Sequence, residues 1–270
     1  MPVTYSHSRL STFENCPRQY RYRYLDKLPR PGPGIEAYVG ICVHKALEFY
    51  FGELRAGRPA PSRADLLAVY EEAWSATSVA GLRIVKTGFD SNDYHLLGRH
   101  CLEIYEAEAA ESEFGEVLGL EKKIHIRLGK TGSYRLIGYI DRFMRGADGV
   151  YEIHDYKTSG SLPRPQDIQQ DRQLALYELG VRGELPAAAR VRHVWHYLTF
   201  GRRFQRILSS TQLQGFARAT TAAIRRVEKE TEFAARTRIL CHWCDFKDHC
   251  PEGREYLENQ PKPGLPVAER

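Results

Sequence analysis

The stretch from residue 134 to residue 157 constrains the fold of this 270-residue chain more than any other. Its first arm, residues 134–143, is rich in Tyr, Ile, Leu and Phe, and its second arm, residues 150–157, alternates apolar and polar residues. Aromatic and β-branched residues suit a pleated strand, and alternation is typical of a half-buried one. The intervening Arg-Gly-Ala-Asp-Gly contains two glycines that can adopt positive φ angles in a turn. The stretch therefore predicts a β-hairpin.

A hairpin centred on Asp148 would bring Asp141 opposite Asp155, since each lies seven residues from that centre. Side chains alternate with a period of two, so both carboxylates would share one face with Lys157 even if the register slipped by two residues. Two carboxylates roughly 5 Å apart across a strand pair repel each other. Either a divalent cation or the Lys157 ammonium should compensate, so a metal site and a cross-strand salt-bridge cluster are both open interpretations. Mg²⁺ and Mn²⁺ prefer such oxygen ligands, and a lysine beside the metal could orient or deprotonate a water for attack on a phosphodiester.

The same residues resemble a known nuclease signature. Gly138-Tyr139-Ile140-Asp141 followed by Glu152-Ile153-His154-Asp155-Tyr156-Lys157 is similar to the motif of PD-(D/E)XK nucleases. It resembles most closely the RecB-like branch, in which a G-x-x-D strand precedes a D-x-K strand. The resemblance implies that Asp141 and Asp155 bind Mg²⁺ or Mn²⁺, aided by the Tyr156 carbonyl, and that Lys157 positions and activates the attacking water.

A further metal ligand is implied upstream. Residues 37–51 carry a helical apolar stripe, and Gly40 and His44 share one face because they are four residues apart. A lone histidine on a helix is more often structural. The G-x-x-x-H spacing, however, resembles a motif of this nuclease branch whose histidine joins the metal site, which implies that His44 is a ligand.

Downstream of the hairpin, residues 166–180 are predicted to form one helix that ends at Gly180, with Gln173 and Tyr177 on the same face. Q-x-x-x-Y after D-x-K also occurs in the family, so the resemblance implies that both residues position the substrate. The expected order of strand, hairpin, helix and further strands matches an α/β fold with a restriction-endonuclease-like core, a mixed sheet flanked by helices. The expected strands outside the hairpin are residues 117–128, 191–199 and 203–208.

Six cysteines lie at positions 16, 42, 101, 241, 244 and 250. Cys241, Cys244 and Cys250 form C-x-x-C-x5-C, and Cys16 could supply a fourth thiolate. Zinc would be satisfied by four cysteines, or by three with His242 or His249, and a 4Fe–4S cluster by four cysteines. The residues leave both open and slightly favour zinc, because structural zinc sites are commoner. Cys42 and Cys101 lie in helical patterns and are expected to be buried.

The cysteine pattern is also similar to that of a subset of the nuclease family. A remote N-terminal cysteine with a C-terminal C-x-x-C-x5-C looks like the iron–sulfur staple of helicase-associated and CRISPR-adaptation members. The resemblance implies a 4Fe–4S cluster on Cys16, Cys241, Cys244 and Cys250 that ties the two ends of the chain around the core.

The expected domain organisation is a single nuclease domain spanning residues 1–258. It comprises a helical part (1–115), the core (116–230) and a cysteine segment (231–258) joined by Cys16, and residues 259–270 are expected to be a flexible tail. A sequence without a long apolar run or a signal peptide predicts a cytoplasmic protein with no membrane contact.

The net charge of +5 permits nucleic-acid binding. The chain contains no phosphate-binding loop, so the protein is expected to act alone on DNA ends or single strands, or beside a helicase or another repair or CRISPR protein. The resemblance favours exonuclease action on single-stranded DNA. A non-cleaving DNA-binding scaffold subunit and a zinc-stapled protein without nuclease activity are the alternatives.

Overall fold

The computed structural model describes residues 3–78, 81–110 and 115–264. The strands are β1 (Thr4–Tyr5), β2 (Glu116–Leu128), β3 (Tyr134–Arg145), β4 (Tyr151–Lys157), β5 (Val191–Tyr197) and β6 (Arg202–Ile207). The α-helices are α1 (His7–Asn15), α2 (Pro17–Tyr20), α3 (Ile35–Arg55), α4 (Arg63–Ser75), α5 (Ser91–Ala110), α6 (Pro165–Gln170), α7 (Gln173–Val181), α8 (Ser210–Lys229) and α9 (Pro251–Glu258). Short 3₁₀ and π turns occupy Arg21–Leu25, Lys130–Gly132, Arg182–Glu184, Leu198–Phe200, Ile239–Trp243 and Lys247–His249.

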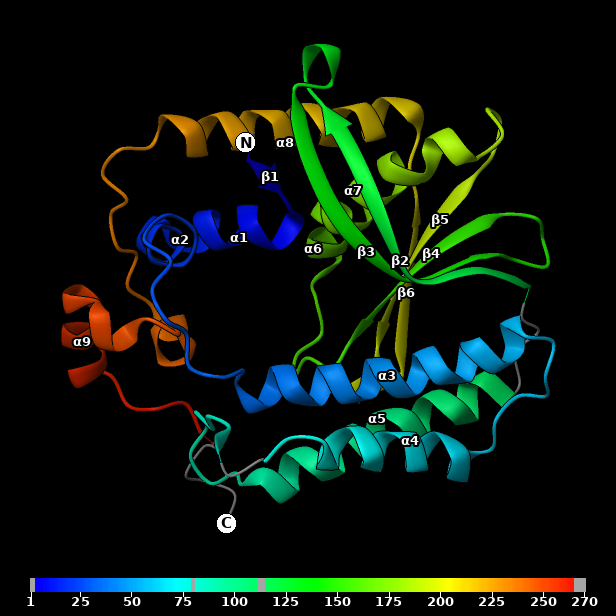
Figure 1. The fold of residues 1–270 in the computed structure, drawn as a ribbon, viewed down its shortest axis with the longest axis horizontal. Helices are drawn as coiled ribbons and strands as arrows, with labels where there is room; N and C mark the ends of the chain where they lie inside the picture. The colour runs from blue at the N-terminus through cyan, green and yellow to red at the C-terminus, as the bar shows by residue number, and fades with distance from the viewer. Residues whose placement is uncertain (1–2, 79–80, 111–114, 265–270) are drawn as a thin grey trace.

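The strands form one mixed six-stranded sheet in the order β1-β3-β4-β5-β6, with β2 paired to β3. Pairs β1–β3 and β4–β5 are parallel, and the other pairs are antiparallel. Helices α7 and α8 lie on one side of the sheet, and α3, α4 and α5 lie together on the other (Figure 1). The predicted α/β fold, a mixed sheet flanked by helices, is therefore confirmed.

The predicted hairpin is β3–β4, and its register is centred on Asp148 as expected. The pairs run from Arg145 opposite Tyr151 to Arg142 opposite His154, and Gly149 adopts a φ of 77° in the turn. Beyond His154, strand β4 leaves β3 while it continues beside β5 as far as Lys157. The sheet therefore opens at the level of Asp141 and Asp155.

The sheet separates two hydrophobic cores. Ile153 and Trp195 pack with Leu174 of α7 on one side. Tyr156, on the same strand as Ile153, packs with residues of α3 and α5 such as Leu47 and Leu102 on the other. Alternation along β4 thus anchors the strand that carries Asp155 and Lys157 in both cores.

The prediction of a single helix over residues 166–180 is wrong, because the structure has two helices, α6 and α7, separated at Asp171. Asp171 has an extended backbone (φ −60°, ψ 121°), and its carboxylate accepts a hydrogen bond from the N–H of Leu174 (3.3 Å). The buried guanidinium of Arg206 donates to the carbonyls of Ile168 (2.7 Å), Gln169 (2.8 Å) and Asp171 (2.9 Å). These side chains replace the backbone hydrogen bonds of a continuous helix.

Residues near both ends of the chain make contacts with the rest of the protein that the sequence did not predict. Residues 4–5, within the part expected to be helical, add strand β1 to the sheet through Tyr5 opposite Leu136. The stretch expected to be a flexible tail contains Pro263, whose carbonyl accepts a hydrogen bond from the N–H of Thr87 (3.0 Å). Residues 265–270 lie outside the described residues. None of the described helices is both long and apolar enough to cross a bilayer.

Candidate active site and cysteine site

Three potential metal ligands from three elements meet where the sheet opens. His44 of α3, Glu121 of β2 and Asp141 of β3 each offer one donor atom, and these atoms lie within 4.8 Å of one another. Nδ1 of His44 lies 3.7 Å from Oδ2 of Asp141 and 3.8 Å from Oε1 of Glu121. Nε2 of His44 lies 3.1 Å from the carbonyl oxygen of Tyr156. With the proton on Nε2, this contact aims the lone pair of Nδ1 at the two carboxylates.

Glu121 was missed in the sequence, although a signal was present. Gly129 and Gly132 mark a turn in the sequence, which the structure centres near Thr131, and Glu121 and Asp141 each lie ten residues from that centre. The observed pairs on either side, Leu120 with Arg142 and Lys122 with Ile140, have this register. Glu121 has a φ of 41°, which is uncommon for a residue with a side chain and marks a local distortion of β2 at the site.

The other predicted residues form a hydrogen-bonded group beside these ligands. The Lys157 ammonium lies 2.7 Å from Oδ2 of Asp155 and donates to Oε1 of Gln173 (3.0 Å). The Gln173 amide donates to Oδ1 of Asp155 (2.8 Å) and to the hydroxyl of Tyr177 (3.1 Å). Oδ2 of Asp155 is buried, and the Lys157 ammonium is its charged partner, so this oxygen still has lone pairs available.

The electrostatics of the site fit a divalent cation. Burial and the nearby Asp155 carboxylate raise the pKa of Asp141 to about 7. Burial would lower the pKa of His44, but Glu121, Asp141 and the Tyr156 carbonyl outweigh it and raise the pKa to about 9. Burial likewise opposes the charge on Lys157, yet its pKa is raised because Asp155 stabilises the ammonium. The Glu121 and Asp141 carboxylates lie together, the Asp155 carboxylate also acts on Asp141, and a bound cation would relieve this repulsion.

Two glycines allow α7 to approach the sheet closely. A Cβ on Gly138, the glycine of the G-x-x-D pattern, would lie 2.5 Å from Cε1 of Tyr177. A Cβ on Gly180 would lie 2.9 Å from Cδ1 of Ile124. Gly180 therefore lies inside α7 for packing and does not end the helix as predicted. The contact at Gly138 explains why the strand bearing Asp141 needs glycine three residues earlier.

The sequence model of the PD-(D/E)XK nuclease superfamily matches residues 4–251. This chain belongs to that superfamily. Membership implies a phosphodiester hydrolase that uses divalent metals, with DNA as its substrate, and the His44–Glu121–Asp141 group provides suitable metal ligands.

Two solved structures are similar to this chain. A crystal structure titled "Putative exonuclease" from Eubacterium rectale has a TM-score of 0.50 at 13% identity, covering 93% of this chain and 87% of that one. The structure of the protein SSO0001 has a TM-score of 0.33 at 14% identity, covering 91% and 95%. No curated protein matches the sequence.

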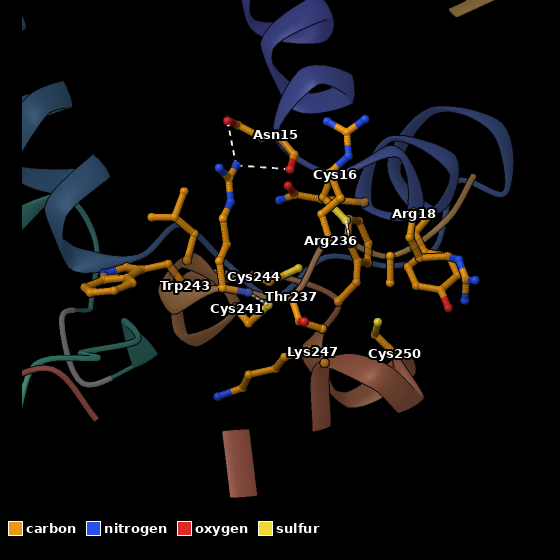
Figure 2. A pocket seen from close by; sticks show the side chains of 17 residues that line it. Asn15, Cys16, Arg18, Arg236, Thr237, Cys241, Trp243, Cys244, Lys247 and Cys250 are labelled. Carbon is orange, nitrogen blue, oxygen red and sulfur yellow. Dashed lines mark hydrogen bonds between the residues drawn. The ribbon is translucent and has the colours of Figure 1, made fainter. Parts of the chain in front are cut away.

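A second site lies at the other end of this nuclease. Cys16, Cys241, Cys244 and Cys250 all line one cavity of about 210 Å³ between the N-terminal helices and the C-terminal segment (Figure 2). The remaining cysteines, Cys42 and Cys101, are buried in the core, as predicted. Chain segments 220 residues apart thus meet at this cavity, where the N–H of Arg236 lies 3.4 Å from Sγ of Cys16.

Backbone N–H groups face all four sulfurs. Arg236 and Arg238 donate to Cys16 (3.4 Å) and Cys241 (3.5 Å), and the N–H groups of Phe246 and Gly253 point to Cys244 and Cys250. Burial, followed by the neighbouring Cys16 and Cys241, raises the pKa of Cys244 to about 11, so holding Cys244 as a thiolate requires bound metal. Arg18, Arg236, Arg238 and Lys247 also line the cavity and suit an anionic metal–thiolate group.

The two ends are also joined without the cysteines. Arg236 donates from Nη1 to the carbonyl of Glu14 (2.8 Å), and Arg238 donates from Nη2 to the carbonyl of Asn15 (3.0 Å). These carbonyls belong to the last turn of α1, where helices lack internal partners for their C=O groups. The arginines therefore cap α1 and hold the C-terminal segment against it.

Proposed function

We propose that this protein is a Mg²⁺- or Mn²⁺-dependent deoxyribonuclease that acts as an exonuclease on single-stranded DNA or DNA ends. The observation that carries the proposal is the convergence of His44, Glu121 and Asp141 beside the ion-paired Asp155 and Lys157. A binding-only module has no use for three carboxylates that would repel phosphates. The exonuclease preference rests on the sequence resemblance and on the name of the structural neighbour.

In the proposed mechanism, the metal would be held by Nδ1 of His44 and by the carboxylates of Glu121, Asp141 and Asp155, with the Tyr156 carbonyl nearby. When bound, the metal stabilises the charge that develops on the phosphate during attack. The Tyr156 N–H, which donates to Oδ2 of Asp141 (2.8 Å), fixes the direction of that carboxylate.

Lys157 is proposed to position the attacking water and to stabilise negative charge. Its pKa is raised, so the side chain remains an ammonium, and this favours an orienting role over removal of a proton from water. Gln173 holds Lys157 and Asp155 together, and Tyr177 in turn accepts a hydrogen bond from Gln173. Gln173 and Tyr177 are therefore proposed as positioning residues.

The test is cleavage of end-labelled single- and double-stranded DNA with Mg²⁺, Mn²⁺ or EDTA. Wild type is compared with Lys157→Ala and with Lys130→Ala, a lysine in the turn after β2. We expect metal-dependent cleavage in wild type and Lys130→Ala and none in Lys157→Ala, with a product ladder that gives the polarity. Absence of cleavage in a folded, metal-loaded wild type would overturn the proposal in favour of a DNA-binding scaffold or a nuclease that requires a helicase partner.

We also propose that Cys16, Cys241, Cys244 and Cys250 bind a structural 4Fe–4S cluster. A single zinc ion at about 2.3 Å from each sulfur would bring its thiolates within roughly 4 Å of one another. In the part of the chain that the structure describes, no three cysteine sulfurs lie within 4.8 Å of one another. A four-iron cluster carries one thiolate on each iron, so its ligands stand farther apart, and backbone N–H donors to the sulfurs suit it.

The cluster proposal is tested by metal analysis of protein purified without oxygen. We expect about four irons per chain and broad absorption near 400 nm. One zinc per chain with no iron would show that the site is a zinc staple, which would leave the nuclease proposal untouched.

A further inference from the structure

A hollow of about 350 Å³ lies beside the catalytic lysine. One wall is apolar and is formed by Ala37 and Val39 of α3 with Leu97 of α5. The loop after β4, residues 158–160, forms another wall, and two lysines, Lys86 and Lys157, also line the hollow. An apolar wall beside cationic groups and hydroxyls matches the chemistry of one nucleotide, whose sugar and base are flat and weakly polar and whose phosphate is anionic.

Lys86 is held in this hollow by the segment that carries it. Three residues before it, the carbonyl of Arg83 accepts a hydrogen bond from the N–H of Ile35 (3.1 Å), and Arg83 donates to the Asp245 carboxylate (3.0 Å). Directly after it, the N–H of Thr87 donates to the carbonyl of Pro263 (3.0 Å). The backbone at Lys86 is therefore fixed on both sides, so the lysine is presented to the hollow in a defined position.

The charge of Lys86 is available to an incoming anion. Its Nζ lies 5.6 Å from the centre of the Phe89 ring, and among the described residues it forms no ion pair. Lys157, by contrast, is already engaged by Asp155 and Gln173. The carboxylate in the hollow, Glu36, accepts hydrogen bonds from the Tyr94 hydroxyl (2.9 Å) and the Trp243 indole (3.1 Å) and is thereby occupied.

We infer that Lys86 binds a non-scissile phosphate of the DNA strand, in a nucleotide subsite next to the one where cleavage occurs. This inference rests on the proposed nuclease function, because it places the subsite on the Lys157 side of the reacting phosphate. The ammonium neutralises one phosphate while the apolar wall contacts the attached sugar and base. Lys86 thus contributes to the binding of longer substrates and takes no part in bond cleavage.

The test compares two substrates in Lys86→Ala, Lys86→Arg and the control Lys130→Ala. The first is a single-stranded oligonucleotide, and the second is bis(p-nitrophenyl) phosphate, which contains only the scissile phosphate. For the oligonucleotide we expect Lys86→Ala to raise KM by about 5- to 20-fold, to leave kcat within about twofold and to reduce the salt dependence of log KM by about one unit of slope. For the single-phosphate ester all variants should equal wild type, and Lys86→Arg should largely restore KM on the oligonucleotide.

Two results would overturn the inference: an unchanged KM and salt slope for Lys86→Ala on the oligonucleotide, or an equal loss on both substrates. If wild type cleaves neither substrate, the nuclease proposal fails by itself, and fluorescence anisotropy with a labelled oligonucleotide in EDTA then tests the subsite. Weaker binding by Lys86→Ala than by Lys130→Ala in that assay would support the subsite, and equal binding would exclude it.

Discussion

The backbone N–H of Tyr156 donates a 2.8 Å hydrogen bond to Oδ2 of Asp141. At this point β3 and β4 have stopped pairing, so a side-chain carboxylate takes the place of a backbone carbonyl. The hydrogen bond ties Asp141 to the strand that carries Asp155 and Lys157. It therefore keeps the proposed metal ligands together where the sheet itself no longer does.

Replacing Asp141 by Asn should lower the nuclease activity and raise the stability of the metal-free protein. Cleavage should fall by at least about 100-fold because a metal ligand is lost. Burial and the Asp155 carboxylate raise the pKa of Asp141 to about 7. The free energy of unfolding therefore decreases as the pH rises from the unfolded-state pKa of Asp141 through 7. At pH 8 the folded state carries the full energetic cost of the Asp141 charge. Asn removes this charge, and we expect the metal-free variant to gain about 1 kcal/mol at pH 8. DNA cleavage assays measure the loss of activity, and urea unfolding with and without Mn²⁺ measures the gain in stability and the loss of metal binding. A variant that Mn²⁺ still stabilises would contradict the ligand role.

The Gln173→Ala variant should lose catalytic rate more than substrate binding. The Gln173 amide is hydrogen-bonded to both Lys157 and Asp155, and the alanine variant loses both contacts. Because the two side chains are then less well positioned, we expect kcat to fall by about 10- to 100-fold with KM within about twofold. Lys130→Ala is the control, and Tyr177→Phe, which keeps the ring against Gly138 and removes only the hydroxyl bonded to Gln173, should lower kcat in the same direction by a smaller factor. A KM increase as large as the kcat loss would show that Gln173 contacts the substrate instead.

Arg206→Met should loosen the junction between α6 and α7. The buried guanidinium donates to three backbone carbonyls there, and leaving them unpaired should cost about 2–4 kcal/mol. Arg203→Met on the same strand is the control, because that side chain is exposed. Chemical denaturation would measure the difference, and equal stability of the two variants would refute the capping role.

Cys16→Ser should remove the metal at the cysteine site, whereas Cys42→Ala should not. Cys16 lines the shared cavity, and Cys42, a residue of α3, is packed in the core. We expect loss of metal and of several kcal/mol of stability in Cys16→Ser, since metal binding contributes directly to folding. Iron content and thermal unfolding are measured for both variants. Full metal occupancy in Cys16→Ser would remove this residue from the ligand set.

The nuclease should become less stable below about pH 6.5. Burial and Arg142 lower the pKa of His154 well below its usual value, and burial and His154 do the same for His196. Arg203 also disfavours protonation of both histidines and Arg192 disfavours that of His154, although the Glu152 carboxylate contacts Nε2 of His154. The unfolded chain therefore binds more protons, and the free energy of unfolding falls as the pH drops through the unfolded-state pKa. Urea titrations at pH 7 and pH 5 should show a smaller decrease for His196→Gln than for wild type, and equal decreases would contradict the assignment.

The hairpin could be predicted because a short glycine-containing turn fixes its register and therefore brings Asp141 near Asp155. Glu121 was within reach of the same reasoning, since it is as far from the turn near Thr131 as Asp141 is. It was missed because it opens a run of charged residues, Glu121-Lys122-Lys123, that is typical of a solvated strand face. Its positive φ is a tertiary distortion without a local signal.

The break between α6 and α7 could not be predicted from local sequence. Residues 166–180 have helical spacing throughout, and the interruption depends on Arg206, which lies far along the chain on β6. The position of Lys86 in the hollow could not be predicted from the sequence either, because it depends on contacts of the surrounding segment with Asp245 and Pro263.

The contacts of Arg236 and Arg238 with the end of α1 have a consequence for the order in which the chain folds during synthesis. Residues 44 to 177 contain every proposed ligand of the catalytic metal and every positioning residue, and they leave the ribosome well before Arg236, Arg238 and the last three cysteines of the cavity. Helix α1 emerges before the catalytic residues, whereas the two arginines that cap it emerge after them. A nascent chain can therefore build its catalytic centre while α1 still lacks its cap, and synthesis of the segment that carries Arg236 and Arg238 completes the contact.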